Sequence, residues 1–206
     1  STKNSTYEVK YPNYFSHEGK EYTINTKLIG NHFISNITGA IALAKKNGIS
    51  IEQSLNSIEH FVGVKRRTEF IGKFNGVNFY DDYGHHPTEI KATTKALKEN
   101  TVGNLIVIFQ PHRFTRTRDH FDDLKNSFDY SDLTLITDIY SAGEKPIPGI
   151  SSLLFEGEGI KYIKSPRMVP HYVKTNIKSG DTVLTIGAGD ITLLGPQILK
   201  YLNENK

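Results

Sequence analysis

The chain begins with a pattern of short strands. Within residues 7–29, apolar and polar positions alternate, as Tyr22, Ile24 and Thr26 do with the residues between them. A period of two residues is typical of a strand with one buried face. Residues 18–20 contain glycine between two charged residues and predict a turn. We therefore expect a small antiparallel sheet in this part of the chain.

The hydrophobic period changes after Gly30. Apolar residues then recur every three or four positions, which predicts a helix over residues 33–47 that ends at Asn47-Gly48. Ser50 precedes a second apolar stripe, and Gln53 follows it by three positions. This spacing is typical of a capping box and predicts that a second helix begins after Ser50.

From residue 68 onward, strand-like and helix-like segments alternate. Asn75-Gly76 separates two strand-like runs and predicts a hairpin, and Pro87 suits the first position of a helix. Apolar strands that alternate with amphipathic helices favour a mostly parallel α/β sheet with flanking helices. The predicted strands are residues 69–74, 77–82, 105–109, 133–137, 160–163 and 182–186, the predicted helices are 87–99, 117–128, 166–178 and a C-terminal one, and the domain boundary falls near 65–67.

Composition narrows the class of protein. With 206 residues, 37% hydrophobic and 23% charged, the chain suits a folded globular protein. It has no cysteine, which excludes disulfides and thiolate metal sites and favours a reducing compartment. No apolar run approaches the roughly 20 residues that span a bilayer, so we expect no membrane insertion. The net charge of +3 permits anionic ligands but does not by itself indicate nucleic-acid binding.

Unusual polar segments follow four of the predicted strands. They are residues 81–87, 110–118, 138–149 and 187–190. Ligands of open parallel sheets bind beyond the carboxyl ends of the strands. If these four strands are parallel, all four segments lie at one edge of the sheet, and we expect the functional site there.

The arginine-rich segment favours an anionic ligand. His112, Arg113, Arg116 and Arg118 lie at the predicted entrance to a helix, where free N–H groups already favour anions. Arginine adds a planar fork suited to carboxylate or phosphate. A solvated basic turn is the alternative, and a nucleic-acid patch is weaker because few neighbouring residues offer stacking.

The segment "DDYGHHP" at residues 81–87 admits three interpretations: a helix-capping turn, a metal site or an acid–base centre. Adjacent histidines in a turn usually point apart, and no H-x-x-x-H spacing supports a metal site. We therefore predict a turn at the ligand edge without a metal. Gly187-Ala188-Gly189 begins like a dinucleotide fingerprint, but Thr192 stands in place of the third glycine, and the sequence contains no P-loop.

Five motifs occur together in one order: "GVKRRTEF", "DDYGHHPTEI", "FQPHRFTRTRDHFDD", "IYSAGEKPIPG" and "GAGDI". With them the chain resembles the Mur ligase family, and in it the branch that joins L-alanine to UDP-N-acetylmuramate. The branch that recycles murein tripeptide shares "GVKRR" and "HHP", but "FQPHRFTRTR" is not expected there. A binding module that holds a nucleotide or another anion without turnover remains the alternative from a different class.

The resemblance implies a domain plan and a reaction. Residues 1–67 would be the C-terminal portion of a central ATP-binding domain, and residues 68–206 a Rossmann-like C-terminal domain. The P-loop would precede this chain, which would then be an inactive C-terminal fragment on its own. ATP would phosphorylate the muramoyl carboxylate, and L-alanine would attack the acyl phosphate during cytoplasmic peptidoglycan precursor synthesis. Mg²⁺ would be held mainly by residues outside the chain, and the oligomeric state is open.

The resemblance also implies roles for single residues. Arg67 matches a residue that reaches the ATP phosphates, Asp82 one on the ribose and Asn36 one near adenine. Phe33 stands where the family pattern has an asparagine, so the adenine stretch departs from that pattern. His86 is expected to be structural. The residues implied on the L-alanine side are Tyr83, His85, His112, Arg113 and Arg116, and the two histidines in this set are the implied catalytic residues.

Overall fold

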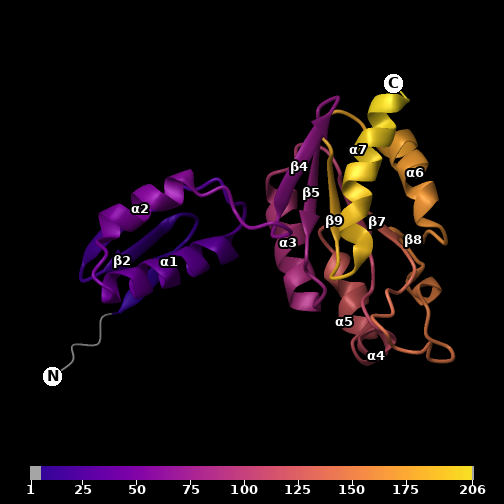
Figure 1. Ribbon diagram of the computed structural model, residues 1–206, viewed down its shortest axis with the longest axis horizontal. Helices are drawn as coiled ribbons and strands as arrows, with labels where there is room; N and C mark the ends of the chain where they lie inside the picture. Colours follow the sequence, from indigo (N-terminus) through magenta and orange to yellow (C-terminus); the bar gives the residue numbers. More distant parts are fainter. Residues whose placement is uncertain (1–5, 206) are drawn as a thin grey trace. The chain divides into compact units, whose positions relative to one another are not determined.

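The structure is a computed structural model that describes residues 6–205. The described residues divide into two compact units, and the boundary between the units lies at residues 63 and 64 (Figure 1). Our predicted boundary falls slightly later, at residues 67 and 68. The assignment of the first unit to a central ATP-binding domain stays a prediction.

The first unit is a three-stranded antiparallel sheet covered by two helices. Phe15 and Ile24 lie in its core together with isoleucines from both helices. The helix cap is confirmed: Ser50 Oγ accepts a hydrogen bond from the Gln53 N–H, and Gln53 Oε1 accepts one from the Ser50 N–H, both at 3.1 Å. The elements are β1 (Tyr7–Lys10), β2 (Tyr14–His17), β3 (Lys20–Thr23), α1 (Asn31–Lys46) and α2 (Ile51–His60).

The second unit contains a six-stranded sheet in the order β4-β5-β9-β6-β7-β8. Only the β4–β5 hairpin is antiparallel, and every other strand pair is parallel. The predicted mostly parallel α/β sheet is therefore confirmed. The strands are β4 (Glu69–Phe74), β5 (Val77–Asp82), β6 (Leu105–Phe109), β7 (Leu133–Ile136), β8 (Ile160–Tyr162) and β9 (Thr182–Ile186).

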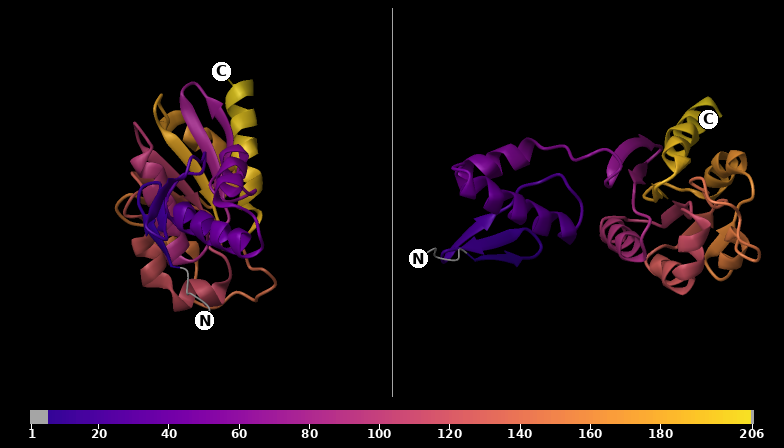
Figure 2. Two further views of the ribbon diagram at one scale, coloured as in Figure 1. Left: turned by 90° about the vertical axis from the view of Figure 1, so that its left-hand side faces the viewer. Right: turned by 60° about the horizontal axis from the view of Figure 1, so that its bottom comes forward.

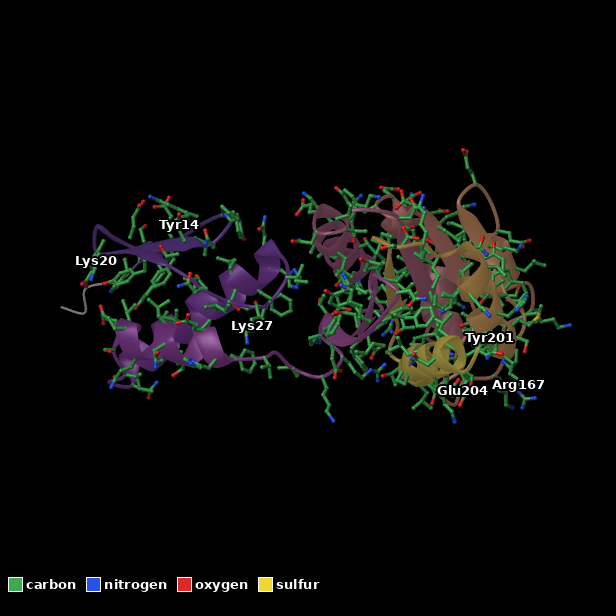
Figure 3. The ribbon with its side chains drawn as sticks, turned by 90° about the horizontal axis from the view of Figure 1, so that it is seen from above. Tyr14, Lys20, Lys27, Arg167, Tyr201 and Glu204 are labelled. Atoms are coloured by element: carbon green, nitrogen blue, oxygen red, sulfur yellow. The ribbon has the colours of Figure 1, made fainter. Side chains whose placement is uncertain are left out.

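Helices cover both faces of this sheet. Alternate strand residues point to opposite sides, so the apolar strands present an apolar surface on each face. Ile106 and Ile108 belong to the core that packs against α6 and α7. Phe109 faces the other way and contacts Phe128, with ring centroids 5.2 Å apart. Figure 2 shows α6 and α7 side by side, and Figure 3 shows polar side chains such as Glu204 on the outer side. The helices are α3 (Pro87–Glu99), α4 (Phe114–Asp119), α5 (Phe121–Lys125), α6 (Val169–Asn176) and α7 (Leu194–Glu204).

Two predicted helices differ from the structure. The helix expected over residues 117–128 begins earlier, at Phe114, and is interrupted at His120 before it ends as a 3-10 turn. It begins early because Arg113 has a left-handed φ of 72°, which turns the chain directly into the helix. The helix expected over 166–178 opens as a 3-10 turn and ends at Asn176. Pro196 is accommodated because it lies in the first turn of α7, where no intrahelical N–H donor is needed.

The carboxyl ends of four strands are aligned. Asp82 of β5 pairs with Ile186 of β9, Ile186 with Phe109 of β6, and Phe109 with Ile136 of β7. All three pairings are parallel, so the segments that follow these strands leave from one edge of the sheet. The expectation that the polar segments share an edge is confirmed.

Candidate functional site

A row of four rings lies along this edge of the sheet. The Tyr83 and His85 centroids are 5.3 Å apart, those of His85 and His112 are 5.8 Å apart, and those of His112 and Tyr140 are 5.6 Å apart. The rings come from three of the four polar segments. The structure thus brings together the predicted residues Tyr83, His85 and His112, and it adds Tyr140, which the sequence did not single out.

One hydrogen bond of the His85 ring indicates its tautomer. Its Nδ1 lies 3.1 Å from the carbonyl oxygen of Tyr83 and 3.8 Å from a carboxylate oxygen of Glu89. A carbonyl oxygen only accepts, so Nδ1 carries the proton and donates it. In the neutral ring the lone pair is then on Nε2, and His85 can accept a proton at that atom.

His112 has the opposite arrangement. Arg116 Nη1 lies 3.4 Å from His112 Nδ1, and because a guanidinium only donates, this nitrogen accepts. Neutral His112 therefore carries its proton on Nε2. Partial burial lowers the pKa of His112 below its ordinary value, and the positive charges of Arg116 and Arg113 lower it further, although the carboxylate of Glu144 opposes the effect. The ring is thus kept neutral and presents an N–H donor.

Arg113 and Arg116 place two guanidinium groups beside His112. Arg113 is exposed at the N-cap of α4, and Arg116 is half-buried one turn later. Arg118 does not join them, because its Nε donates to Asp119 Oδ1 at 2.7 Å on the exposed surface. The cluster suits an anion such as a carboxylate, which two guanidinium groups bind well.

Asp82 is buried and holds the turn together. Its two carboxylate oxygens accept hydrogen bonds from the N–H groups of Thr68 and Gly84, each at 2.7 Å. Burial raises the pKa of Asp82, although these hydrogen bonds and Arg67 oppose the effect. Its side chain is only 3% exposed. In this structure Asp82 orders the segment around it, and its contact with ribose stays a prediction.

Arg67 lies at the Tyr83 end of the row. Its Nη1 is 3.6 Å from Glu89 Oε1, and its guanidinium carbon is 5.7 Å from the centre of the Tyr83 ring. The side chain is 47% exposed. An exposed guanidinium at the ligand edge fits the predicted contact with phosphate, which stays a prediction.

Arg66 is a residue that the sequence did not reveal. Its Nη2 donates to the carbonyl oxygens of Gly187 at 2.6 Å and Gly189 at 3.1 Å, and its Nε is 3.7 Å from Asp81 Oδ2. Its guanidinium carbon lies 4.8 Å from the centre of the Tyr83 ring. Arg66 therefore links the start of this unit to the segment after β9. The paired arginines of "GVKRRTEF" signalled this position but not which arginine turns inward.

The two remaining predicted residues lie outside the ring row. His86 is the N-cap of α3, where its ring nitrogen accepts from the Thr88 N–H at 3.4 Å, so a structural role is supported. Asn36 is exposed on α1 of the first unit. Within residues 6–205, no group of three or more His, Cys, Asp or Glu side chains could hold a metal ion. Across the same residues, no helix has the length and apolar character needed to cross a membrane.

Comparisons with known sequences agree with this architecture. The sequence model described as "Mur ligase, glutamate ligase domain" matches residues 66–189. A UDP-N-acetylmuramate–L-alanine ligase of Desulforamulus reducens is 38% identical over 182 residues, which cover 85% of this chain and 39% of the relative. One from Chelativorans sp. is 43% identical over 170 residues, which cover 79% of this chain and 37% of the relative. The chain thus spans about two fifths of the length of these relatives.

Solved structures share the fold. A UDP-N-acetylmuramate-alanine ligase from Thermotoga maritima matches with a TM-score of 0.76 at 23% identity, covering 93% of this chain and 43% of that one. A MurF ligase from Thermotoga maritima, solved in complex with ADP, matches with a TM-score of 0.73 at 15% identity, covering 98% of this chain and 46% of that one. The fold is that of the Mur ligase C-terminal domain with flanking helices.

Proposed function

The chain belongs to the Mur ligase family, and we propose that it supplies the amino-acid side of a UDP-N-acetylmuramate–L-alanine ligase. The proposal covers the ATP-dependent joining of L-alanine to UDP-N-acetylmuramate in cytoplasmic peptidoglycan precursor synthesis. It is supported by the relatives that carry this name and by the ring row with its two guanidinium groups. Because the chain spans only part of those relatives, the P-loop chemistry would come from outside it.

Arg113 and Arg116 would hold the carboxylate of L-alanine. Both lie at the entrance of α4, and Arg116 already donates toward His112. Two guanidinium groups can grip a carboxylate from two sides, which orients the rest of a small amino acid. The amino group would then point toward the histidines.

The two histidines have different tautomers and would therefore have different roles. His85, with its lone pair on Nε2, would accept a proton from the amine nitrogen as that nitrogen bonds to the carbonyl carbon of the acyl phosphate. His112, with N–H on Nε2, would donate a hydrogen bond to an oxygen of the reacting group. The bond between that carbon and the phosphate oxygen would break, and phosphate would leave. Tyr83 would form the wall of the pocket beside His85.

Three residues of the chain would contact the nucleotide. Arg67 would contact the ATP phosphates, Asp82 the ribose, and Asn36 the adenine. ATP use is supported by the MurF ligase that was solved with ADP. Mg²⁺ would be held mainly by residues outside this chain, and the described residues contain no group of three or more His, Cys, Asp or Glu side chains that could hold a metal ion.

Amide formation is the test of this function. A complete ligase that carries these 206 residues would be given ATP, UDP-N-acetylmuramate and L-alanine, and the alanyl product and phosphate would be measured. In Arg113→Ala and Arg116→Ala, the KM for L-alanine should rise much more than the KM for ATP. Equal rises in both would exclude the carboxylate role, and Lys145→Ala, an exposed site on a neighbouring segment, is the control.

Two further outcomes would change the assignment. Product formed from murein tripeptide but not from L-alanine would indicate the recycling branch. Binding of nucleotide by the complete protein without any product would indicate a non-catalytic module. The 206-residue chain alone should hydrolyse no ATP, because its sequence contains no P-loop.

A further inference from the structure

Residues 138–149, the segment "DIYSAGEKPIPG", have no role in the function proposed so far. Yet their main chain is joined to the arginine-rich turn. The Tyr140 N–H donates to the Pro111 carbonyl oxygen, and the Arg113 N–H donates to the Tyr140 carbonyl oxygen, each at 2.8 Å. His112 and Tyr140 thereby form a parallel bridge beyond the ends of β6 and β7.

The Tyr140 side chain adds a second contact. Its ring is stacked on His112, with centroids 5.6 Å apart and planes 17° apart. Gly189 also lies close to the base of the Tyr140 ring: a Cβ added there would be 2.7 Å from Tyr140 Cγ and 2.3 Å from Gln110 Oε1. Any side chain at residue 189 would displace the tyrosine ring. The ring is therefore held in place by two neighbouring segments even though the residue is 38% exposed.

Glu144, from the same segment, holds the other end of the turn. Its carboxylate accepts from the Thr115 N–H at 3.0 Å and from the Thr115 hydroxyl at 2.6 Å. The N-cap of α4 is Arg113, which provides no capping side chain of its own. Glu144 supplies that missing acceptor from a distant part of the chain.

The backbone of Arg113, which donates one of these hydrogen bonds, is strained. Arg113 has a φ of 72°, which residues other than glycine rarely adopt and which persists only where the surroundings enforce it. Tyr140 fixes the N–H of Arg113, and Glu144 fixes the residue two positions later. The strained backbone and the contacts of Tyr140 and Glu144 thus lie at or beside Arg113, the residue proposed to bind the carboxylate of L-alanine.

We propose that residues 140–144 form a positioning clamp for the amino-acid site. Tyr140 sets the plane of the His112 ring and the backbone of Arg113, and Glu144 sets the start of α4 and with it Arg116. Both are positioning residues, because they act through His112 and the two arginines. The inference rests on the proposed function of those residues.

The test compares variants that keep or remove each contact. Tyr140→Phe retains the stacked ring, Tyr140→Ala retains only the main-chain bonds, and Glu144→Gln retains an acceptor without charge. In the complete ligase, Tyr140→Ala should raise the KM for L-alanine by roughly ten- to a hundredfold, since small misplacements are costly, and leave the KM for ATP unchanged. Tyr140→Phe should stay near the wild type, Glu144→Ala should follow Tyr140→Ala, and Glu144→Gln should restore most of that loss.

A second measurement does not depend on activity. In the 206-residue chain, NMR should show the His112 ring protons shifted by the ring current of Tyr140, and the shift should vanish in Tyr140→Ala but persist in Tyr140→Phe. An unchanged His112 signal in the alanine variant would overturn the clamp. So would equal effects on the two KM values in a variant that is folded by circular dichroism.

The arginine variants distinguish a failure of the clamp from a failure of the proposed carboxylate site. If Arg113→Ala and Arg116→Ala raise the KM for L-alanine while Tyr140→Ala and Glu144→Ala do not, the clamp is wrong and the function stands. If none of the four variants changes that KM, the carboxylate site itself is wrong.

Discussion

Replacing Arg66 by methionine should loosen the edge of the sheet on which the candidate site is built. Methionine keeps much of the length and apolar character of the arginine stem but removes the guanidinium. The carbonyl oxygens of Gly187 and Gly189 then lose a donor, and Asp81, which is 2% exposed, loses the nearby cation.

The expected cost follows from these contacts. Leaving a buried acceptor without its partner costs about 1–3 kcal/mol, and breaking a buried ion pair about 3–5 kcal/mol. The Arg66 side chain is 25% exposed, and Asp81 keeps hydrogen bonds from the hydroxyls of Thr185 and Thr192, both at 2.7 Å. We therefore expect a loss of about 2–4 kcal/mol in the stability of the second unit, below the sum of the separate terms.

Hydrogen exchange is the suitable assay, because it reports the stability of each unit separately and the two units need not unfold together. The chain also has no tryptophan whose fluorescence could follow unfolding. Amides of β5 and β9 should exchange roughly 30- to 1000-fold faster in Arg66→Met, since each 1.4 kcal/mol corresponds to a factor of ten. Amides of α2, in the other unit, provide the internal reference. Arg118→Met, the same change at an exposed arginine, should leave β5 and β9 unchanged. Unaltered exchange of β9 in Arg66→Met, or equal acceleration in Arg118→Met, would show that the Arg66 guanidinium does not stabilise this edge of the sheet.

Three further outcomes are expected. The imidazole of His112 should titrate by NMR below its ordinary pKa of 6.5, and Arg116→Met should raise that pKa by removing a nearby positive charge; an unchanged value would contradict the electrostatic account. Because the folded chain binds this proton more weakly than the unfolded chain, the stability contributed by His112 should be present above pH 6.5 and be lost as the pH falls through the folded pKa. Gly76→Ala should lower the midpoint of thermal unfolding, since φ is 85° and the added Cβ would lie 2.2 Å from Ser179 Oγ; a stability equal to wild type would show that the hairpin adapts. Ser50→Ala should destabilise α2 by about 1 kcal/mol, measured by the hydrogen exchange of its amides. Unchanged exchange of these amides would mean that the capping box does not stabilise α2.

Local signals in the sequence determined most of the elements. The Asn75-Gly76 hairpin, the Ser50 cap and the start of α3 at Pro87 all lie where the sequence predicts them. Each depends on residues within a few positions of one another, so the order of amino acids is sufficient. The alternation of apolar strands with helices likewise favoured a parallel sheet, which in turn placed four polar segments at one edge.

Helix boundaries were less predictable. The early start of α4 depends on the left-handed backbone of Arg113, which is held by Tyr140, and on an acceptor from Glu144. Neither partner lies near the helix in the sequence. Periodicity alone therefore placed the helix too late and missed its interruption at His120.

The chemistry of the site depended still more on tertiary structure. The sequence indicated that Asp82, the histidines and the arginines belong to one edge, but it left open which of Arg66 and Arg67 turns inward. That choice depends on carbonyl groups of Gly187 and Gly189, more than a hundred positions away in the chain. The protonated nitrogen of each histidine is likewise set by the atom that lies opposite it, Tyr83 oxygen for His85 and the Arg116 guanidinium for His112. Residue types and their periodicity thus placed these side chains at one edge of the sheet, whereas hydrogen-bond partners that only folding brings together decided which atoms of each side chain donate and which accept.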